Sequence, residues 1–239
     1  LRLNIKSNQL LQPVIPRNRL LHFIEYPSLA PITLISAPAG FGKTTLAAQW
    51  AEHARRQPVW VSIQTDANSP DRFLSALIAG IQAAGFDAAE ESAASETAIA
   101  SVAEHLARAA AAQPLVLILD DYHTVDSLDV HRLMDVLLRL CAPHLPVFIL
   151  SREQLTFALS RERLTGNVRE VTADQLRFHP DEITSVVQST SPNRLDQSQI
   201  DQLALRTDGW IAGIQLTLKA FDALGGRGEN VPIESLTAH

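Results

Sequence analysis

Short apolar runs alternate with longer stretches of helical periodicity over the first 173 residues. Several of these runs are almost continuously hydrophobic, which is typical of strands covered on both faces of a parallel sheet. We predict five strands: Ile32–Ser36, Val59–Ile63, Leu115–Asp120, Val147–Ser151 and Val168–Val171. The stretches between them predict helices: Thr45–Arg55, Asp71–Ala84, Thr97–Ala112 and Val130–Cys141. This alternation predicts an α/β domain with a parallel β-sheet between helices.

The pattern changes after about Ala173, because no strand-like run follows. Three stretches of helical periodicity remain, and we predict a helix in each: "HPDEITSVVQS", Ser198–Thr207 and Asp208–Leu224. Trp210 falls on the apolar stripe of the last stretch, so we expect it in the core of this helical unit. The sequence therefore predicts two domains, an α/β domain over residues 1–173 and a small helical domain over residues 174–239.

Composition narrows the class of protein. A chain of 239 residues that is 46% hydrophobic is long enough to bury a core. Its net charge of −6 disfavours nonspecific binding to nucleic acid or to an anionic membrane. No apolar run has the ~20 residues that span a bilayer, and one cysteine permits no internal disulfide. We therefore expect a cytoplasmic protein with no membrane partner. Because the chain begins at Leu1, we also expect a piece of a longer protein.

The stretch "SAPAGFGKTTL" follows the first predicted strand and opens the first predicted helix. It fits the phosphate-binding pattern G-x-x-x-x-G-K-[ST], with Ala37 in place of the first glycine. Lys43 would meet the β- and γ-phosphates, the Thr44 hydroxyl would ligate Mg²⁺, and Thr45 would face the α-phosphate. The alternative is a glycine turn with a surface lysine. The predicted nucleotide-binding residues of this loop are Ala39, Gly40, Phe41, Gly42, Lys43, Thr44 and Thr45.

Two further strand ends carry charged residues. "LVLILDD" ends in carboxylates that are costly to bury without a cation or hydrogen bonds. Asp120 would hold Mg²⁺, and Asp121 would polarise an attacking water; a helix cap or turn is the alternative. His123, just beyond, is expected to support the aspartates rather than to bind a metal. Arg152 follows "VFILS", where it would touch the γ-phosphate or be an ordinary surface arginine.

Together these strings resemble the N-terminal ATPase module of the MalT-like, LuxR-type transcriptional activators, which are signal-transduction ATPases with numerous domains. The matching strings occur in the family's order: "LISAPAGFGKTTLAAQW", "WVSIQTDANSPDRFLSAL", "LVLILDDYHTV", "FILSRE", "DQLRFHPDE" and "TDGWIAGIQL". The resemblance implies a P-loop NTPase domain followed by a small helical domain, with the nucleotide at their junction.

The resemblance also implies roles for individual residues. Asp121 becomes the catalytic carboxylate beside Lys43, and Arg152 becomes the phosphate-sensing arginine. Ile15 and Arg17 lie in "VIPRNRLL", where relatives contact adenine. Ile211 stands where relatives carry a proline that packs against the base.

The implied function is an ATP-dependent switch. ATP with Mg²⁺ would favour an open state that self-associates, ADP would favour a closed state, and slow hydrolysis would act as a timer. The partners would be the other domains of a longer chain, and DNA would bind only through domains outside this sequence. Two alternatives remain open at this stage: a dedicated P-loop enzyme, such as a kinase or motor ATPase, and a module that binds nucleotide structurally.

Overall fold

A parallel sheet, built from strands within residues 32–172, lies at the centre of the α/β part of the protein. The structure, a computed structural model, describes residues 14–63, 68–87, 93–155, 159–190 and 195–223. Among these residues five strands pair in parallel in the order β2-β3-β4-β1-β5. Their bounds are β1 Ile32–Ser36, β2 Gln57–Ser62, β3 Leu115–Asp120, β4 Val147–Ser151 and β5 Val168–Thr172. The predicted parallel α/β fold is confirmed.

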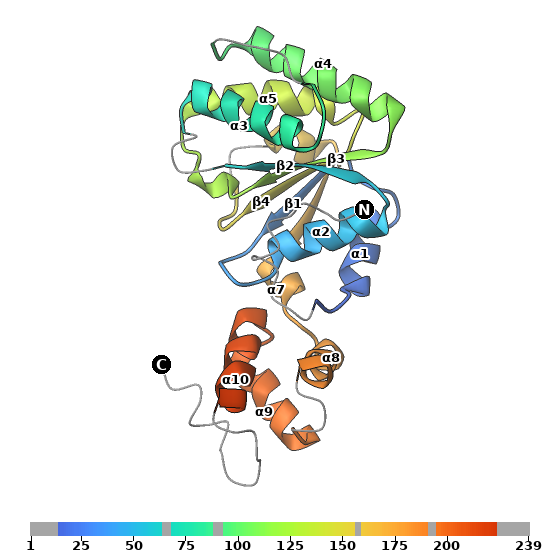
Figure 1. Cartoon of the computed structure of the whole chain (residues 1–239), viewed down its shortest axis with the longest axis vertical. Coiled ribbons are helices and arrows are strands. Elements are labelled where there is room, and N and C mark those ends of the chain that lie inside the picture. The colour runs from blue at the N-terminus through green and yellow to red at the C-terminus, as the bar shows by residue number, and fades with distance from the viewer. Residues whose placement is uncertain (1–13, 64–67, 88–92, 156–158, 191–194, 224–239) are drawn as a thin grey trace.

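Helices cover both faces of this sheet (Figure 1). One face carries α3 Pro70–Ala83, α4 Glu96–Ala112 and α5 Leu128–Cys141, and the other carries α1 Asn18–Glu25 and α2 Lys43–His53. The strand side chains alternate between the two layers, as a pleated strand requires. Thus Leu117 of β3 packs under α3–α5, whereas its neighbour Ile118 packs under α1 and α2. Because both faces are covered, the three inner strands β1, β3 and β4 are almost continuously apolar and buried.

A helical unit with its own core follows the sheet (Figure 1). The chain leaves β5 through the short helix α7 Ala173–Leu176 and enters α8 Pro180–Thr190, α9 Gln197–Thr207 and α10 Ile211–Ala223. Ile183, Val186, Leu203 and Ile214 are among the buried residues of this unit. The boundary that we predict after residue 173 stays a prediction, and residues 224–239 of the predicted helical domain lie outside the described residues.

Three local differences from the sequence prediction have physical causes. Strand β2 begins two residues before the predicted Val59, since it pairs with β3 from Gln57 onward. Pro58 argues against a strand at this point, because proline has no N–H to pair within a sheet. β2 is an edge strand, however, where the missing N–H is tolerated. Helix α1 was not predicted because its eight residues are too few for a clear periodic signal. The remaining short elements are η2 Tyr122–Thr124 and α6 Ser160–Leu164.

Trp210 is the third difference. We predicted it within a helix and in a core, but α10 begins at Ile211 and Trp210 is 37% exposed. Asp208 and Gly209 both adopt left-handed backbone, with φ of 47° and 70°, which ends α9 and redirects the chain. A Cβ on Gly209 would lie 2.7 Å from the carbonyl oxygen of Phe178, so only glycine fits this turn.

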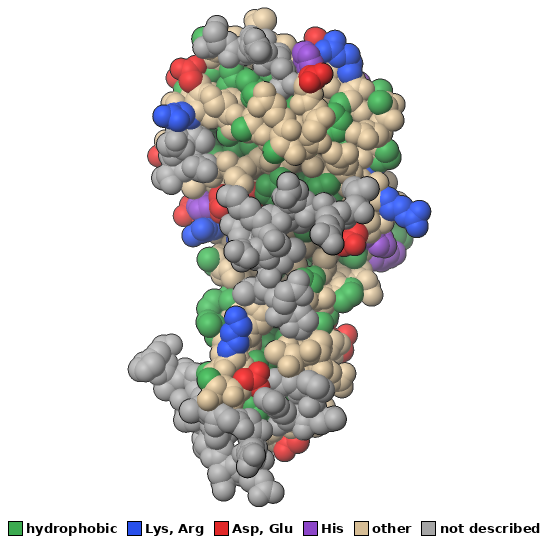
Figure 2. All heavy atoms as spheres, viewed as in Figure 1, with side chains coloured by type: hydrophobic (Ala, Val, Ile, Leu, Met, Phe, Trp, Pro, Cys, Tyr) green, Lys and Arg blue, Asp and Glu red, His purple; other side chains and the backbone are tan. Residues whose placement is uncertain are grey.

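The surface carries charges of both signs. On the face drawn in Figure 2, acidic and basic side chains are interspersed among the described residues. Within the described ranges, no helix is both long enough and apolar enough to cross a bilayer.

Candidate functional site

The loop between β1 and α2 forms a cradle at the carboxyl edge of the sheet. Gly40 and Gly42 have φ of 78° and 83°, a left-handed conformation that other residues adopt only with strain. Gly42 is the N-cap residue of α2, and no side-chain cap bonds the first turn of this helix in the described part of the chain. Its first amide groups and the positive end of its dipole therefore face the loop, as in an anion-binding helix N-terminus.

Lys43 is folded into this loop. Its Nζ donates to the carbonyl oxygens of Ala37 at 2.7 Å and Pro38 at 3.0 Å. The side chain is buried, and burial lowers the pKa of its ammonium group, whereas Asp120 and Asp121 act in the opposite direction. The charge is thus held inside the cradle, within the field of two carboxylates.

Thr44 and Asp120 place two oxygen atoms next to each other. The Thr44 hydroxyl donates to Asp120 Oδ2 at 3.1 Å, and the amide of Asp121 donates to Asp120 Oδ1 at 2.9 Å. Burial raises the pKa of the Asp120 carboxyl, and the charge of Asp121 raises it further. A hydroxyl and a carboxylate are the oxygen ligands that Mg²⁺ prefers, usually together with phosphate oxygens and waters. Among the described residues, no three His, Cys, Asp or Glu side chains are arranged so that they could hold a metal ion by themselves.

Asp121 lies between two basic groups. Its Oδ1 is 3.7 Å from Arg152 Nε and 3.8 Å from His123 Nδ1. Asp121 directly follows β3 and Arg152 directly follows β4, and these strands are parallel neighbours, so their ends meet at one edge. Burial lowers the pKa of His123, and the charge of Arg152 lowers it further, which favours the neutral imidazole. The predicted charged residues Asp121 and Arg152 are therefore brought together beside His123, and the supporting role expected of His123 stays a prediction.

A cavity of about 180 Å³ opens beside the loop. It is lined from the loop side by Gly40, Gly42, Lys43, Thr44, Thr45 and Leu46. Its other walls come from the N-terminal segment and the helical unit: Val14, Ile15, Arg17, Phe178, Val186, Ile211 and Gln215. The sequence predicted Ile15, Arg17, Thr45 and Ile211 as nucleotide contacts, and the structure gathers all four around this cavity.

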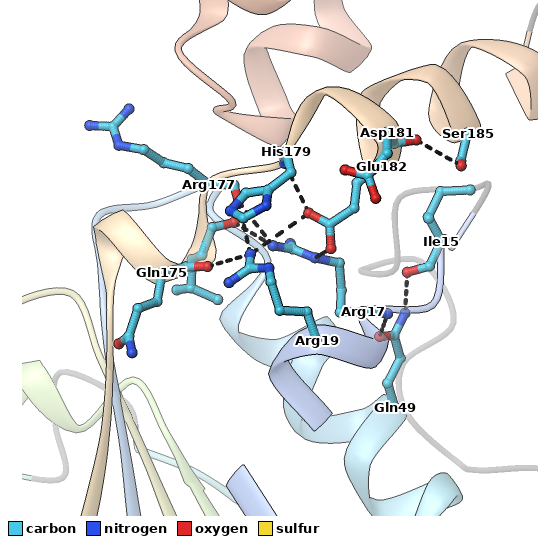
Figure 3. Close-up of polar contacts among 11 residues, drawn as sticks. Ile15, Arg17, Arg19, Gln49, Gln175, Arg177, His179, Asp181, Glu182 and Ser185 are labelled. Carbon is cyan, nitrogen blue, oxygen red and sulfur yellow. Dashed lines mark hydrogen bonds and ion pairs between the residues drawn. The ribbon is translucent and has the colours of Figure 1, made fainter. Parts of the chain in front are cut away.

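Arg17 has protein partners of its own (Figure 3). Its guanidinium donates to Glu182 Oε1 at 3.0 Å through Nε, and to the carbonyl oxygens of Leu176 at 2.9 Å and Arg177 at 3.2 Å. It also lies over the Phe178 ring, 3.8 Å from the centroid. The side chain thus fastens the N-terminal segment to the helical unit, and the adenine contact that the resemblance implies for Arg17 stays a prediction.

Gln49 of α2 also holds the N-terminal segment, through the backbone of Ile15 and Arg17 (Figure 3). Its Nε2 donates to the carbonyl oxygen of Ile15 at 2.7 Å, and its Oε1 accepts from the amide of Arg17 at 3.1 Å. Sequence reasoning missed both Gln49 and Glu182. A contact between residues 165 positions apart leaves no trace in local periodicity. The one signal in the sequence is that Glu182 is an acidic residue in the first turn of α8, where a carboxylate is favoured.

The start of α10 contacts the loop directly. The indole Nε1 of Trp210 donates to the carbonyl oxygen of Ala39 at 3.2 Å, and the amide of Ala212 donates to that of Gly40 at 3.2 Å. A Cβ on Gly40 would lie 2.7 Å from Ala212 Cβ and 2.9 Å from Trp210 Nε1. The close approach therefore depends on glycine at this position. Phe41 lies farther out on the loop, with the Arg177 guanidinium 5.9 Å from its ring centroid.

A larger cavity, of about 640 Å³, lies away from the loop. Pro31, Asp135, Arg139 and Asn167 are among its lining residues, and Pro31 precedes the start of β1. This end of the sheet is opposite the carboxyl edge where ligands of parallel α/β proteins bind. The smaller cavity is therefore the better candidate site, because its position and its lining agree with the loop chemistry.

Comparison with known proteins gives a consistent result. Residues 17–150 match the protein family described as "AAA ATPase domain". The chain is 32% identical over 213 residues to the HTH-type transcriptional regulator MalT of Cronobacter sakazakii, and 30% identical to that of Serratia proteamaculans. Each alignment covers 86% of this chain and 24% of the relative, so the chain spans about a quarter of the length of these curated relatives.

Two solved structures share the fold. One is a Signal Transduction ATPase with Numerous Domains protein with a tetratricopeptide repeat sensor from Pyrococcus horikoshii, with a TM-score of 0.57 and 17% identity over 95% of this chain and 32% of the other. The other is Cdc6p from Pyrobaculum aerophilum, with a TM-score of 0.57 and 14% identity over 90% of this chain and 64% of the other. At these identities the likeness establishes the fold alone.

Proposed function

The chain belongs to the AAA ATPase domain family, and on this premise we propose that it binds Mg²⁺–ATP at the Ala37–Thr44 loop as the nucleotide switch of a longer transcriptional regulator. The observation that carries the switch is the pair of hydrogen bonds to the loop from Trp210, which directly precedes α10, and from Ala212 of α10. A nucleotide that reshapes the loop would act on the helical unit through these two hydrogen bonds. The regulator context is supported by the names of the curated relatives.

In this proposal the loop amides and Lys43 bind the phosphates. The Lys43 ammonium would exchange the carbonyl oxygens of Ala37 and Pro38 for phosphate oxygens without leaving the cradle. Thr44 and Asp120 would hold Mg²⁺, whose charge would offset that of the phosphate oxygens and of the buried carboxylate.

Asp121 and Arg152 would serve hydrolysis. Asp121 is half-exposed, so its carboxylate would accept a proton from the attacking water. The ion pair between Asp121 and Arg152 is long and also half-exposed, and such pairs exchange partners at little cost. Arg152 would therefore turn to the γ-phosphate when ATP is present and return to Asp121 when ADP remains.

A switch needs nucleotides that bind its two states with different affinities. We propose that ADP favours the closed arrangement, in which α10 contacts the loop, and that ATP favours an open state that self-associates. Other domains of the longer chain would receive this change and bind DNA, in the cytoplasm of the bacterium.

The test is thermal unfolding with and without Mg²⁺–ATP. At a hundredfold excess over Kd, ATP should stabilise the wild-type chain by about 2.7 kcal/mol. Lys43→Ala should lose this stabilisation, whereas Lys219→Ala, which removes an exposed lysine of α10, should keep it. Asp121→Ala should keep binding but form ADP at least about a hundredfold more slowly. Equal stabilisation of wild type and Lys43→Ala would contradict the proposed binding site.

A further inference from the structure

Gln215 carries a buried amide oxygen that no group of the described residues bonds. It lies on α10 one turn after Ile211 and is 7% exposed. Its Oε1 has no hydrogen-bond partner in the part of the chain that the structure describes. A buried amide oxygen without a partner destabilises a folded protein, and natural proteins rarely tolerate one without a reason. Gln215 lines the 180 Å³ cavity, so a ligand there is a reason that the structure offers.

The surroundings of Gln215 fit a flat ring better than a charged group. Ile15, Phe178, Val186 and Ile211 contribute apolar side chains to the walls of the same cavity. Apolar walls with a small number of convergent polar groups are typical of small-molecule sites in which the polar groups fix orientation. A purine base has this character, since its faces are apolar and its edge carries donors and acceptors.

The fold sets how far Gln215 lies from the loop. Ile211 is close to the loop, since its Cγ2 would lie 3.8 Å from a Cβ placed on Gly42. Gln215 follows Ile211 one helical turn later. Ile15 and Arg17 line the same cavity, and Gln49 fixes both of them by bonding their backbone groups (Figure 3). A nucleotide with its phosphates on the loop would therefore extend its base toward Gln215.

We propose that Gln215 recognises the base of the bound nucleotide, with Oε1 accepting a hydrogen bond from the 6-amino group of adenine. This inference rests on the proposed function, since it assigns the other end of the same ligand. The unpartnered atom is an acceptor, so it requires a donor, and the exocyclic amine of adenine is one. Glutamine amides pair with adenine through this amine when proteins read bases.

The experiment compares two nucleotides that differ only in that amine. The Kd of ATP and of purine riboside triphosphate, which lacks the 6-amino group, is measured for the wild-type chain and for Gln215→Met. Methionine keeps the length of the side chain and removes the amide. Gln202→Met, on the exposed face of α9, is the matched control.

The wild type and the control should bind ATP roughly tenfold more tightly than the analogue, as expected for one buried hydrogen bond. Gln215→Met should bind both equally. Gln215→Leu provides a second variant should Met fold poorly, and Tm values verify folding for each.

Each other outcome contradicts the assignment in a distinguishable way. If Gln215→Met keeps the preference for ATP, another group recognises the amine. If 2′-deoxy-ATP is measured as a third nucleotide and Gln215→Met loses only the preference for ATP over it, Gln215 contacts the ribose. In both cases the proposed function stands, provided that binding still requires Lys43. If neither nucleotide binds the wild type, the proposed function fails together with this inference.

Discussion

At the scale of single residues, Asp120 combines burial with charge. Burial and Asp121 raise its pKa above the ordinary 3.8, so the ionised carboxylate costs the folded state free energy at neutral pH. A group whose pKa is raised by folding contributes stability below its unfolded pKa and loses it as pH rises through the folded value. Asp120→Asn should therefore raise the Tm of the nucleotide-free chain at pH 7, and the gain should vanish as pH falls toward 4. Thermal unfolding at both pH values checks this.

The same substitution should weaken stabilisation by Mg²⁺–ATP, because it removes the anionic ligand. A lower Tm at pH 7 without nucleotide would contradict the view that the charge of Asp120 is retained for the ligand rather than for the fold.

Glu182 offers a second residue-scale prediction. It is the anionic partner of Arg17, whose guanidinium is buried and whose pKa burial lowers. Glu182→Ala leaves that cation without its carboxylate, so we expect a loss of about 3 kcal/mol in the free energy of unfolding. The neighbouring Asp181→Ala removes an exposed carboxylate of the same helix turn and should cost at most about 1 kcal/mol. Denaturant titration of both variants distinguishes them; equal losses would mean that the ion pair adds nothing.

The residues of the site divide by how local their signal is. The closeness of Lys43, Thr44 and Asp120 could be predicted, because each belongs to a short motif at a strand end. The contacts of Gln49 and Glu182 and the place of Gln215 at the cavity could not, since only the folded chain assembles them.

At the scale of elements, the contact between the loop and α10 can be measured with two glycines. Gly40 and Gly85 both have positive φ, but a Cβ on Gly85 meets nothing within 4 Å in the described chain, whereas one on Gly40 overlaps Ala212. Gly85→Ala should cost about 1 kcal/mol for its backbone alone.

Gly40→Ala should cost clearly more, because the added methyl also pushes α10 from the loop. The comparison uses nucleotide-free chains in chemical denaturation. A loss equal to that of Gly85→Ala would show that α10 does not press on the loop in solution.

The element boundaries show where sequence patterns fail. The inner strands β1, β3 and β4 were predictable from their apolar runs, because both faces of the sheet are covered. The start of α10 was not, because Trp210 continues the apolar stripe while the left-handed backbone at Asp208 and Gly209 interrupts the helix.

At the scale of the whole molecule, Cys141 reports on unfolding. It is fully buried in α5, and burial raises the pKa of its thiol to about 12. Since the thiolate is the reactive form, the folded chain should resist alkylation at pH 8 and react through unfolded molecules. Mg²⁺–ATP at a hundredfold excess over Kd should slow labelling about a hundredfold, but not in Lys43→Ala. If Mg²⁺–ATP left the labelling rate of Cys141 in the wild type unchanged, the result would contradict the proposal that nucleotide binding stabilises the whole folded chain.

The whole-molecule arrangement was only partly predictable. Alternating elements predict a parallel sheet followed by helices, but they carry no information on which strands are neighbours, so the order β2-β3-β4-β1-β5 came from the structure. The docking of the helical unit onto the loop is likewise a property of three-dimensional packing, and the proposed switch depends on it.

The measurement that tests the switch most directly is ADP formed per chain over time after mixing with Mg²⁺–ATP, with Lys43→Ala as the control. The account predicts that ADP rises to about one per chain and then nearly stops, because the closed ADP state holds its product. Sustained turnover that Lys43→Ala abolishes would contradict the account and identify a dedicated P-loop enzyme instead.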